Sequence, residues 1–421
     1  MNMLLLLLTL LFPSLAHAAA IGHATAEVTS NQTTSSTTFV DVTGATLASG
    51  SFTTGKKYLI HITAQIGFTS GDGTEVRVIH GSTEFDGSKA WQVMTSTETR
   101  RAYSFTTVWT AVSSEGIALQ YRSRTGGANT ASANFVHILA MNLSDDVTEN
   151  TDWFFNEVSA DDAMSTSYED GASITFTPAT ASHDWLILGD VLVDYAAQCA
   201  NYVSVRINAG TPVLPQAIID CTNTALEEFQ FGLARVYTLA ASSQTIKLQY
   251  AVSASTTANH LNSRIFAIDL HKFRNHAFAY TEAGTALSAT DWATQIQTVS
   301  LTPDVQGDVW IGGYWSFDRN SSGNMANQRI QVDGSDQPSG QTTAAYDFRR
   351  GSDGTDEDPM MISTSVTNMT AAAHTIDLDG SVNATTSTPE AETATLWAVT
   401  MELPAAAASS TGGLMLMGVG R

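Results

Sequence analysis

The chain is poor in basic residues and in cysteine, and each shortage excludes a class of protein. Its 421 residues include 19 Lys and Arg against 41 Asp and Glu, a formal net charge of −22 at pH 7. Such a charge repels phosphate backbones, so we expect no nucleic-acid partner. Only two cysteines are present, which excludes a disulfide scaffold and a zinc site built on thiolates.

Long apolar runs are also scarce. Residues 4–11 are nearly all apolar and precede Pro13 and Ala16-His17-Ala18, the order of an export signal cleaved after Ala18. The run is shorter than the roughly 20 residues of a spanning helix, and no later segment matches it, so we expect no integral membrane span after removal of this leader, 1–18. An uncleaved hydrophobic anchor or assembly helix is the alternative, because no Lys or Arg precedes the run.

Catalytic signatures are missing as well. The sequence has no G-x-S-x-G elbow, no H-E-x-x-H helix and no phosphate-binding glycine loop, and its ten histidines are scattered without an H-x-H pair. We therefore predict that the protein is not an enzyme and needs no cofactor.

What the chain does have is a repeat of about 125 residues. An aromatic residue opens an apolar strand at Tyr58, Trp185 and Trp310, in steps of 127 and 125 residues. A pre-strand triplet around Thr53, a basic strand running into a glycine turn, a late strand and a closing strand keep the same order in each copy. A unit of this length can bury its own core, so we expect three domains arranged as beads.

Apolar and polar residues alternate with a period of two, and no stretch keeps a helical period. Tyr58, Ile60 and Ile62 share one face of a strand, opposite His61 and Thr63, which predicts a half-buried strand. His61 is expected either to be exposed or to have a hydrogen-bonded structural role. Six to eight such strands per unit favour an all-β protein of three tandem antiparallel β-sandwiches of the jelly-roll type.

Two joints and a terminal change in composition set the expected boundaries. The sandwiches are expected at 19–147, 148–273 and 274–404, followed by a flexible tail at 405–421. The tail is rich in Ala, Ser and Gly and ends in Leu414, Met415, Leu416 and Met417. These four residues are either the tip of a docking peptide that promotes assembly or part of a disordered terminus.

The two cysteines are candidates for a disulfide. Cys199 and Cys221 each lie eleven residues from Gly210 (210 − 199 and 221 − 210), so a hairpin centred there would bring them side by side. Export makes a disulfide permissible, and a loop of this size would contribute about 3 kcal/mol in the chain-entropy model. Two small buried thiols are the alternative interpretation.

The densest carboxylate cluster is a candidate calcium site. It consists of Asp353, Asp356, Glu357 and Asp358 in a loop rich in Ser and Gly, and oxygen ligands on a flexible loop suit Ca²⁺. The spacing lacks the full EF-hand pattern, and Arg349 and Arg350 could neutralise these charges, so a solvated acidic loop is the competing interpretation.

A glycan platform is a further hypothesis. Alternation puts Trp315 and Phe317 on one face of a strand of the third unit, with Asp318 and Asn320 at its edge. An exposed pair of rings there would bind a sugar, whereas packing in the core is the default for aromatic residues in a sandwich.

Repetition without a repeated catalytic constellation favours a non-enzymatic, exported structural or adhesive protein, located outside the cell or on its surface. Its expected partner is itself, in a homo-oligomer or filament, with a surface glycan or a host protein as further candidates. Two alternatives stay open. One is a virion fibre, spike or decoration protein, by analogy of architecture; the other is a carbohydrate-binding protein or weak carbohydrate-active enzyme.

Overall fold

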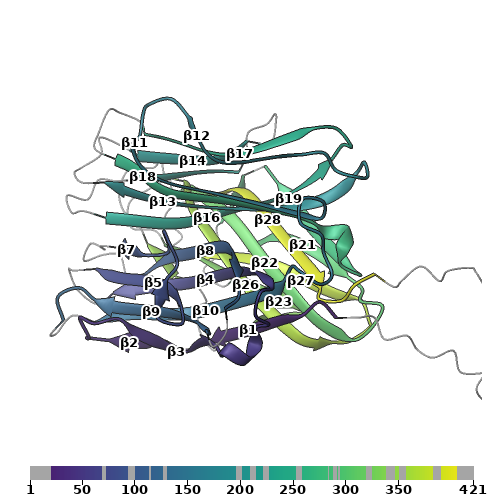
Figure 1. The fold of residues 1–421 in the computed structure, drawn as a ribbon, viewed down its shortest axis with the longest axis horizontal. Coiled ribbons are helices and arrows are strands. Elements are labelled where there is room, and N and C mark those ends of the chain that lie inside the picture. The colour runs from purple at the N-terminus through teal and green to yellow at the C-terminus, as the bar shows by residue number, and fades with distance from the viewer. Residues whose placement is uncertain are drawn as a thin grey trace, which may run out of the picture.

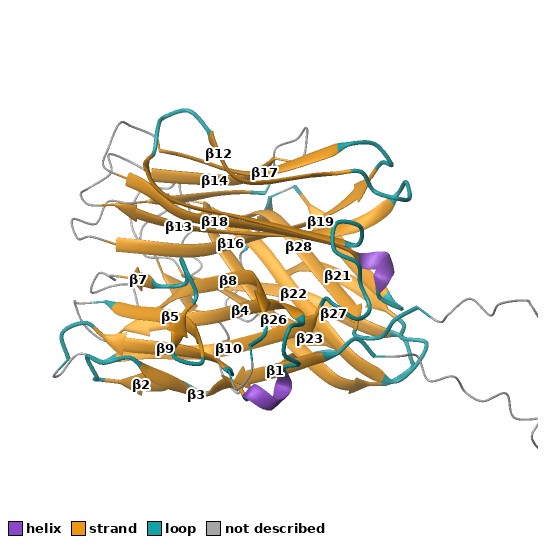
Figure 2. Ribbon diagram, viewed as in Figure 1, coloured by secondary structure: helices purple, strands orange, loops and turns teal. Residues whose placement is uncertain are grey.

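The computed structural model describes residues 20–68, 73–92, 100–112, 115–126, 130–195, 202–208, 215–220, 227–252, 258–282, 284–287, 292, 294–318, 325–337, 347–349, 357–382 and 390–404. This part of the chain is mostly antiparallel strand, with two short 3₁₀ helices, η1 (Ser49–Ser51) and η2 (Leu270–Lys272) (Figure 2). The predicted all-β sandwich class is confirmed. Within these ranges, no helix is long and apolar enough to cross a lipid bilayer.

The strands fall into three groups along the chain. The first group is β1 (His23–Val28), β2 (Gln32–Thr34), β3 (Val40–Leu47), β4 (Lys57–Phe68), β5 (Thr74–His80), β6 (Thr83–Glu84), β7 (Ala90–Gln92), β8 (Arg100–Thr110), β9 (Ile117–Ser123) and β10 (Ala131–Asn142). The second group is β11 (Trp153–Ala163), β12 (Glu169–Phe176), β13 (His183–Tyr195), β14 (Tyr202–Asn208), β15 (Gln216–Asp220), β16 (Glu227–Leu239), β17 (Gln244–Val252) and β18 (Ala258–Asp269). The third group is β19 (His276–Thr281), β20 (Thr285–Ala286), β21 (Thr294–Leu301), β22 (Gly307–Asp318), β23 (Met325–Val332), β24 (Ser335–Gln337), β25 (Asp347–Arg349), β26 (Glu357–Met369), β27 (His374–Val382) and β28 (Glu390–Thr400).

The described strands form four hydrogen-bonded sheets, because two nine-stranded sheets each run from one group into the next. Each group nevertheless contributes two four-stranded segments, and the order of strands in them is the same in all three groups. What we call the inner sheets have the orders β1-β10-β4-β8, β11-β18-β13-β16 and β19-β28-β22-β26. The outer sheets have the orders β3-β9-β5-β7, β12-β17-β14-β15 and β21-β27-β23-β24. Two facing four-stranded antiparallel sheets with this crossing connectivity form a jelly roll. The groups are called repeats 1, 2 and 3 below.

The repeated landmarks of the sequence occupy corresponding strands. Tyr58, Trp185 and Trp310 lie near the starts of β4, β13 and β22 and are all buried. The expected boundaries at 147/148 and 273/274 fall between β10 and β11 and between β18 and β19. The periodic signal therefore identified equivalent strands of a repeated fold.

The repeats are not separate beads, because one apolar cluster contains residues from all three. Leu139 of repeat 1, Val191 of repeat 2 and Trp310 of repeat 3 belong to it, and each is completely buried. Burial of this kind supplies about 25 cal/mol per Å² of apolar surface. The expectation of independent beads is wrong, because much of the apolar surface of each inner sheet faces the other repeats.

The last strands of the three inner sheets, β8, β16 and β26, contact one another, and we call them the interface strands. Each also lies beside the end of a neighbouring outer sheet: β7 beside β16, β15 beside β26, and β25 beside β8. The first two contacts include single antiparallel bridges, Glu228 to Trp91 and Ile218 to Glu357. These contacts, from repeat 1 to 2, from 2 to 3 and from 3 to 1, close a ring within one chain. In Figure 1 the strands of repeat 2 lie above those of repeat 1, and those of repeat 3 are drawn in green to yellow.

β4 was expected to be half-buried, and this expectation is wrong, because its polar face is buried as well. His61 has the hydrogen-bonded role that was the alternative to exposure, since its Nδ1 lies 3.0 Å from Thr106 Oγ1. His61, Thr63 and Gln65 are completely buried, because this face of the inner sheet receives the interface strand of repeat 3. The backbone N–H of Ser363 on β26 donates to Thr63 Oγ1 at 3.1 Å. The alternation was real, but its polar side faces another repeat.

The same docking occurs at the other two contacts of the ring. The N–H of Thr106 on β8 donates to Asp190 Oδ2 on β13 at 2.7 Å. Thr395 Oγ1 on β28 donates to the carbonyl of Ala234 on β16 at 3.0 Å. A side chain of each inner sheet thus satisfies a backbone group at the edge of the preceding interface strand.

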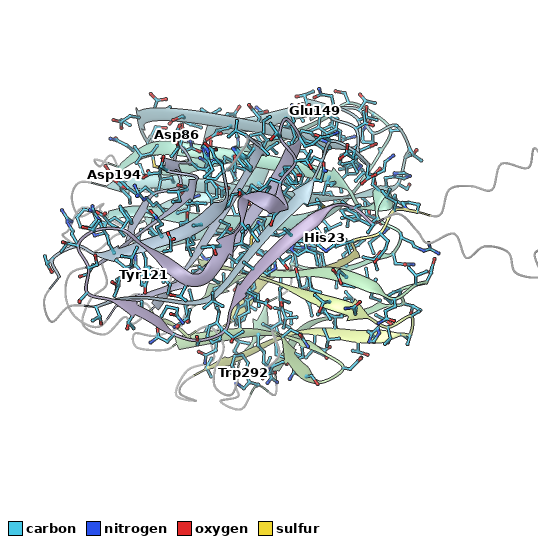
Figure 3. All side chains as sticks on the ribbon, turned by 60° about the horizontal axis from the view of Figure 1, so that its bottom comes forward. His23, Asp86, Tyr121, Glu149, Asp194 and Trp292 are labelled. Carbon is cyan, nitrogen blue, oxygen red and sulfur yellow. The ribbon has the colours of Figure 1, made fainter. Side chains whose placement is uncertain are left out.

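The two ends of the described chain meet at one end of the molecule, which we call the terminal end. Ala20 pairs with Glu402, and the N–H of Ile21 donates to the carbonyl of Met401 at 2.8 Å. Figure 3 shows His23 and Glu149 toward this end and Tyr121 and Asp194 toward the opposite one. The segment just before β1 is therefore hydrogen-bonded to the end of repeat 3.

Candidate functional site

Among the described residues, polar side chains capable of chemistry gather at the buried ring interface and at the joint between repeats 2 and 3. The second group, which we call the joint cluster, consists of His183, Asp184, Asp269, His271 and His276. The two groups differ in access to solvent, and this difference separates a structural role from a binding role.

The joint cluster forms where the start of β13, the helix η2 and the start of β19 come together. His183 and Asp184 begin β13, whose start pairs with the end of β18, so that Trp185 lies opposite Asp269. Asp269 then caps η2, accepting a hydrogen bond from the backbone N–H of His271 at 2.9 Å. β19 begins at His276, which brings a third imidazole to the same place.

Contacts within the joint cluster are close. His183 Nδ1 lies 2.7 Å from Asp269 Oδ2, and His271 Nδ1 lies 3.5 Å from Asp269 Oδ1. His276 Nε2 lies 3.5 Å from Asp184 Oδ2. The rings of His183 and His271 stack with their centroids 4.1 Å apart, and the ring of His276 meets that of His271 edge-on at 4.7 Å.

The joint cluster is partly open to water. The side chains of His183, His271 and His276 are 24%, 36% and 18% exposed. Burial lowers the pKa of His276, and the neighbouring His271 lowers it further, against the hydrogen bond and charge of Asp184. His276 is therefore favoured as a neutral imidazole with a lone pair to share.

The ring interface, in contrast, is closed. Arg264 Nη1 donates to Asp190 Oδ1 at 3.0 Å, and both side chains are essentially buried. Arg264 also donates to the carbonyls of Asp86 and Gly87 in repeat 1. Burial raises the pKa of Asp190 to about 6 against the opposing charge of Arg264. These charges fasten repeat 2 to repeat 1.

A serine and a histidine meet in the contact between repeats 1 and 3. His137 Nδ1 lies 2.7 Å from Ser363 Oγ, and its Nε2 lies 2.9 Å from Ser365 Oγ. Only 1% of His137 is exposed, and burial lowers the pKa values of His137 and His61 to about 3 each. Both ring nitrogens are occupied and no substrate has access, so this pair is structural.

A pocket of about 380 Å³ lies at the joint between repeats 1 and 2, lined in part by Lys57, Glu149 and Trp153. Lys57 Nζ lies 2.6 Å from Glu149 Oε2 and 5.7 Å from the centre of the Trp153 ring. Opposite charges within the pocket are therefore already paired, and we assign no ligand to it.

The glycan hypothesis rested on an exposed Trp315 next to Phe317, Asp318 and Asn320. Trp315 is completely buried in the core of repeat 3, as the default interpretation expected, and its ring fills space between the sheets. Phe317 and Asp318 lie at the end of β22, where the backbone pairs them with Asp358 and Glu357 of β26. The side chains of these four residues, and Asn320, lie outside the described residues.

Several other predictions fall on undescribed parts of the chain. Asp353 and Asp356 of the calcium hypothesis, both cysteines of the disulfide hypothesis (Cys199 and Cys221) and the assembly tip lie outside the described residues. That tip consists of Leu414, Met415, Leu416 and Met417. These predictions remain predictions.

The joint cluster was missed by sequence reasoning. Its only local signals are the adjacent pair His183-Asp184 and the two histidines His271 and His276 flanking the second joint. Neither spacing is a metal-binding motif, and only the pairing of β13 with β18 joins them.

No protein-family model matches the chain, and no curated protein matches it in sequence. Among solved structures, PNGF-II is similar at 9% identity and a TM-score of 0.26, covering 82% of this chain and 99% of that one. The insecticidal delta-endotoxin Cry8Ea1 of Bacillus thuringiensis is similar at 12% identity and a TM-score of 0.20, covering 48% of this chain and 42% of the toxin. Dimeric latent PorU of Porphyromonas gingivalis is similar at 11% identity and a TM-score of 0.22, covering 86% of this chain and 32% of that one. Similarities this weak carry no argument about function.

Proposed function

We propose that the protein is an exported, non-enzymatic structural or adhesive block, in which three jelly rolls close a ring within one chain and assemble with further copies. The observation that carries this proposal is the cyclic docking of the interface strands β8, β16 and β26. Fixing three sandwiches in one chain gives a rigid body that presents the same kind of surface three times, which favours multivalent contact.

The use of the buried polar groups supports a structural role. Asp190, Arg264 and His137 would be candidates for catalysis by residue type, yet all three are buried in contacts between repeats. Catalytic acids and bases must reach a substrate proton, directly or through one water. Here the titratable groups hold the ring together instead.

The ring also restricts where further copies can add. The interface strands are covered by neighbouring repeats, so strand addition is directed to the opposite edges of the sheets. The outer sheets end at β3, β12 and β21. Thr46, Thr175 and Thr298 are exposed on these three strands, and they offer a direct way to block such addition with charge.

The test is electron microscopy and sedimentation of the purified full chain, with mass spectrometry of its N-terminus. We expect ordered assemblies and a mature protein that starts near Ala19. A triple variant, Thr46→Lys, Thr175→Lys and Thr298→Lys, should abolish assembly without a change in the unfolding midpoint.

The matched control is Thr53→Lys, Thr177→Lys and Thr302→Lys. It adds the same charge at exposed positions of the equivalent triplets outside the strands, and it should assemble like the wild type. Monomers at every concentration and ionic strength would overturn the assembly role. Assembly that both triple variants weaken equally would overturn the assignment to these edges.

A further inference from the structure

We propose that the joint cluster binds one divalent transition-metal ion, represented by Zn²⁺, through His271, His276 and Asp184, and thereby pins repeat 3 to repeat 2. This site is independent of the assembly proposed above. It uses chemistry at the terminal end of the molecule that the ring contacts leave unexplained.

The donor set decides the class of ion. Two imidazoles and one carboxylate suit Zn²⁺ and its first-row neighbours, whereas Ca²⁺ and Mg²⁺ prefer oxygen ligands alone. Three protein ligands leave a fourth position of a tetrahedron for water. Partial exposure of His271, at 36%, provides the path by which an ion enters.

The geometry is close to what such an ion needs. Asp184, His271 and His276 each offer a ligand atom, and the three atoms lie within 4.8 Å of one another. Tetrahedral ligands about 2.1 Å from one ion lie about 3.4 Å apart. The 3.5 Å between His276 Nε2 and Asp184 Oδ2 matches this separation, and His271 offers its ligand atom within 4.8 Å of both.

A second group of ligands, His183, Asp269 and His271, also lies within 4.8 Å. There, however, His183 Nδ1 and Asp269 Oδ2 are 2.7 Å apart, a hydrogen-bond distance that is too short for two ligands of a tetrahedral ion. We therefore assign Asp269 and His183 to the layer around the metal. From there Asp269 holds the backbone of His271, as outer groups commonly orient ligands.

Asp184 is oriented in the same way. Its Oδ1 accepts a hydrogen bond from Thr238 Oγ1 at 2.6 Å, which leaves Oδ2 directed toward His276. The ligands come from the start of β13, from η2 and from the start of β19. A bound ion would therefore connect the last segment of repeat 2 with the first strand of repeat 3.

The test is calorimetric titration of the full chain, first stripped with a chelator, with Zn²⁺ alone. We expect one ion per chain and a rise in the unfolding midpoint on addition of Zn²⁺. Co²⁺ at the same site should give the visible absorption of a tetrahedral complex. His271→Ala should abolish binding, and His276→Gln and Asp184→Asn should each weaken it by about tenfold or more.

The control is His374→Gln. His374 Nδ1 also pairs with a carboxylate, Asp333 Oδ2, at 2.7 Å, but it lies in repeat 3 outside the joint cluster, so its replacement should leave Zn²⁺ affinity unchanged. No uptake by the wild type, or equal uptake by His271→Ala, would overturn the proposal. If His183→Gln weakens Zn²⁺ binding and His276→Gln does not, the assigned ligands are wrong. Sedimentation measures assembly and calorimetry measures Zn²⁺ binding, so each proposal can fail without the other.

Discussion

Ser104 Oγ lies 3.4 Å from Met361 Sδ, although 257 residues separate them in the chain. Ser104 is on β8 and Met361 on β26, and both also approach Gly232 on β16. The centre of the ring is thus the point where equivalent positions of the three interface strands converge. There is no room at this point for another side chain on β16.

The first prediction concerns this convergence. A Cβ atom on Gly232 would lie 2.5 Å from Ser104 Oγ and 2.8 Å from Ser104 Cβ, so Gly232→Ala must push two interface strands apart. We expect a loss of about 1–3 kcal/mol in the free energy of unfolding, as for other overpacked interiors. Urea unfolding followed by tryptophan fluorescence measures it. Gly50→Ala is the control, because a Cβ there meets nothing within 4 Å. Equal stability of the two variants would contradict the close approach.

The second prediction concerns Arg264. Replacement by Leu leaves Asp190 buried without its cation, and breaking a buried pair from one side costs about 3–5 kcal/mol. The loss should be greatest near pH 8, where Asp190, with its pKa of about 6, is ionised. Lys247→Met is the control, since Lys247 pairs with Asp170 at the surface and such a pair contributes about 0–1 kcal/mol. The measurement is the urea unfolding midpoint of the wild type and of both variants at pH 5 and pH 8. A larger loss at pH 5 than at pH 8 would refute this account.

The sequence predicted the strands of each sandwich but not the contacts between the sandwiches. The steps between Tyr58, Trp185 and Trp310 identified equivalent strands, because burial inside one sandwich imposes a local period. The polar residues of the other face, such as His61, follow the same period whether they meet water or another repeat. Local alternation cannot distinguish these environments, so the ring was not predicted. The joint cluster was missed for the same reason, since it depends on contacts between distant segments.

The third prediction concerns pH. Glu27 accepts a hydrogen bond from Thr364 in repeat 3, and burial raises its pKa from 4.5 to about 7. A carboxyl whose pKa is raised by folding favours the folded state most below pH 4.5, and this contribution is lost as the pH rises through 7. The neighbouring His137, with a pKa of about 3 in the folded state, stays neutral across this range.

Glu27→Gln should therefore remove a pH-dependent part of the stability. The free energy of unfolding of the wild type minus that of the variant should fall between pH 4.5 and pH 7.5, by on the order of 1–3 kcal/mol. Chemical unfolding at several pH values measures this difference. Thr53→Ser, an exposed substitution that changes no titrating group, should give a flat difference. A difference that rises with pH for Glu27→Gln would have the wrong sign.

The last prediction uses the meeting of the two chain ends. Ala20 pairs with Glu402, so a short Gly/Ser linker can connect Pro404 to Ala20 and the chain can be opened elsewhere. We expect a permutant opened between Asp145 and Asp146 to fold with nearly the wild-type unfolding midpoint. The opening loosens the exposed pair of Lys56 with Asp145 and the hydrogen bond from Asn142 to Asp145, and every contact among β8, β16 and β26 is kept. A permutant opened inside β4, between Thr63 and Ala64, interrupts a strand that is buried on both faces and should not fold. If both permutants fold equally well, stability does not depend on the docking of β4 against β26, and the closed ring is not what holds the three sandwiches together.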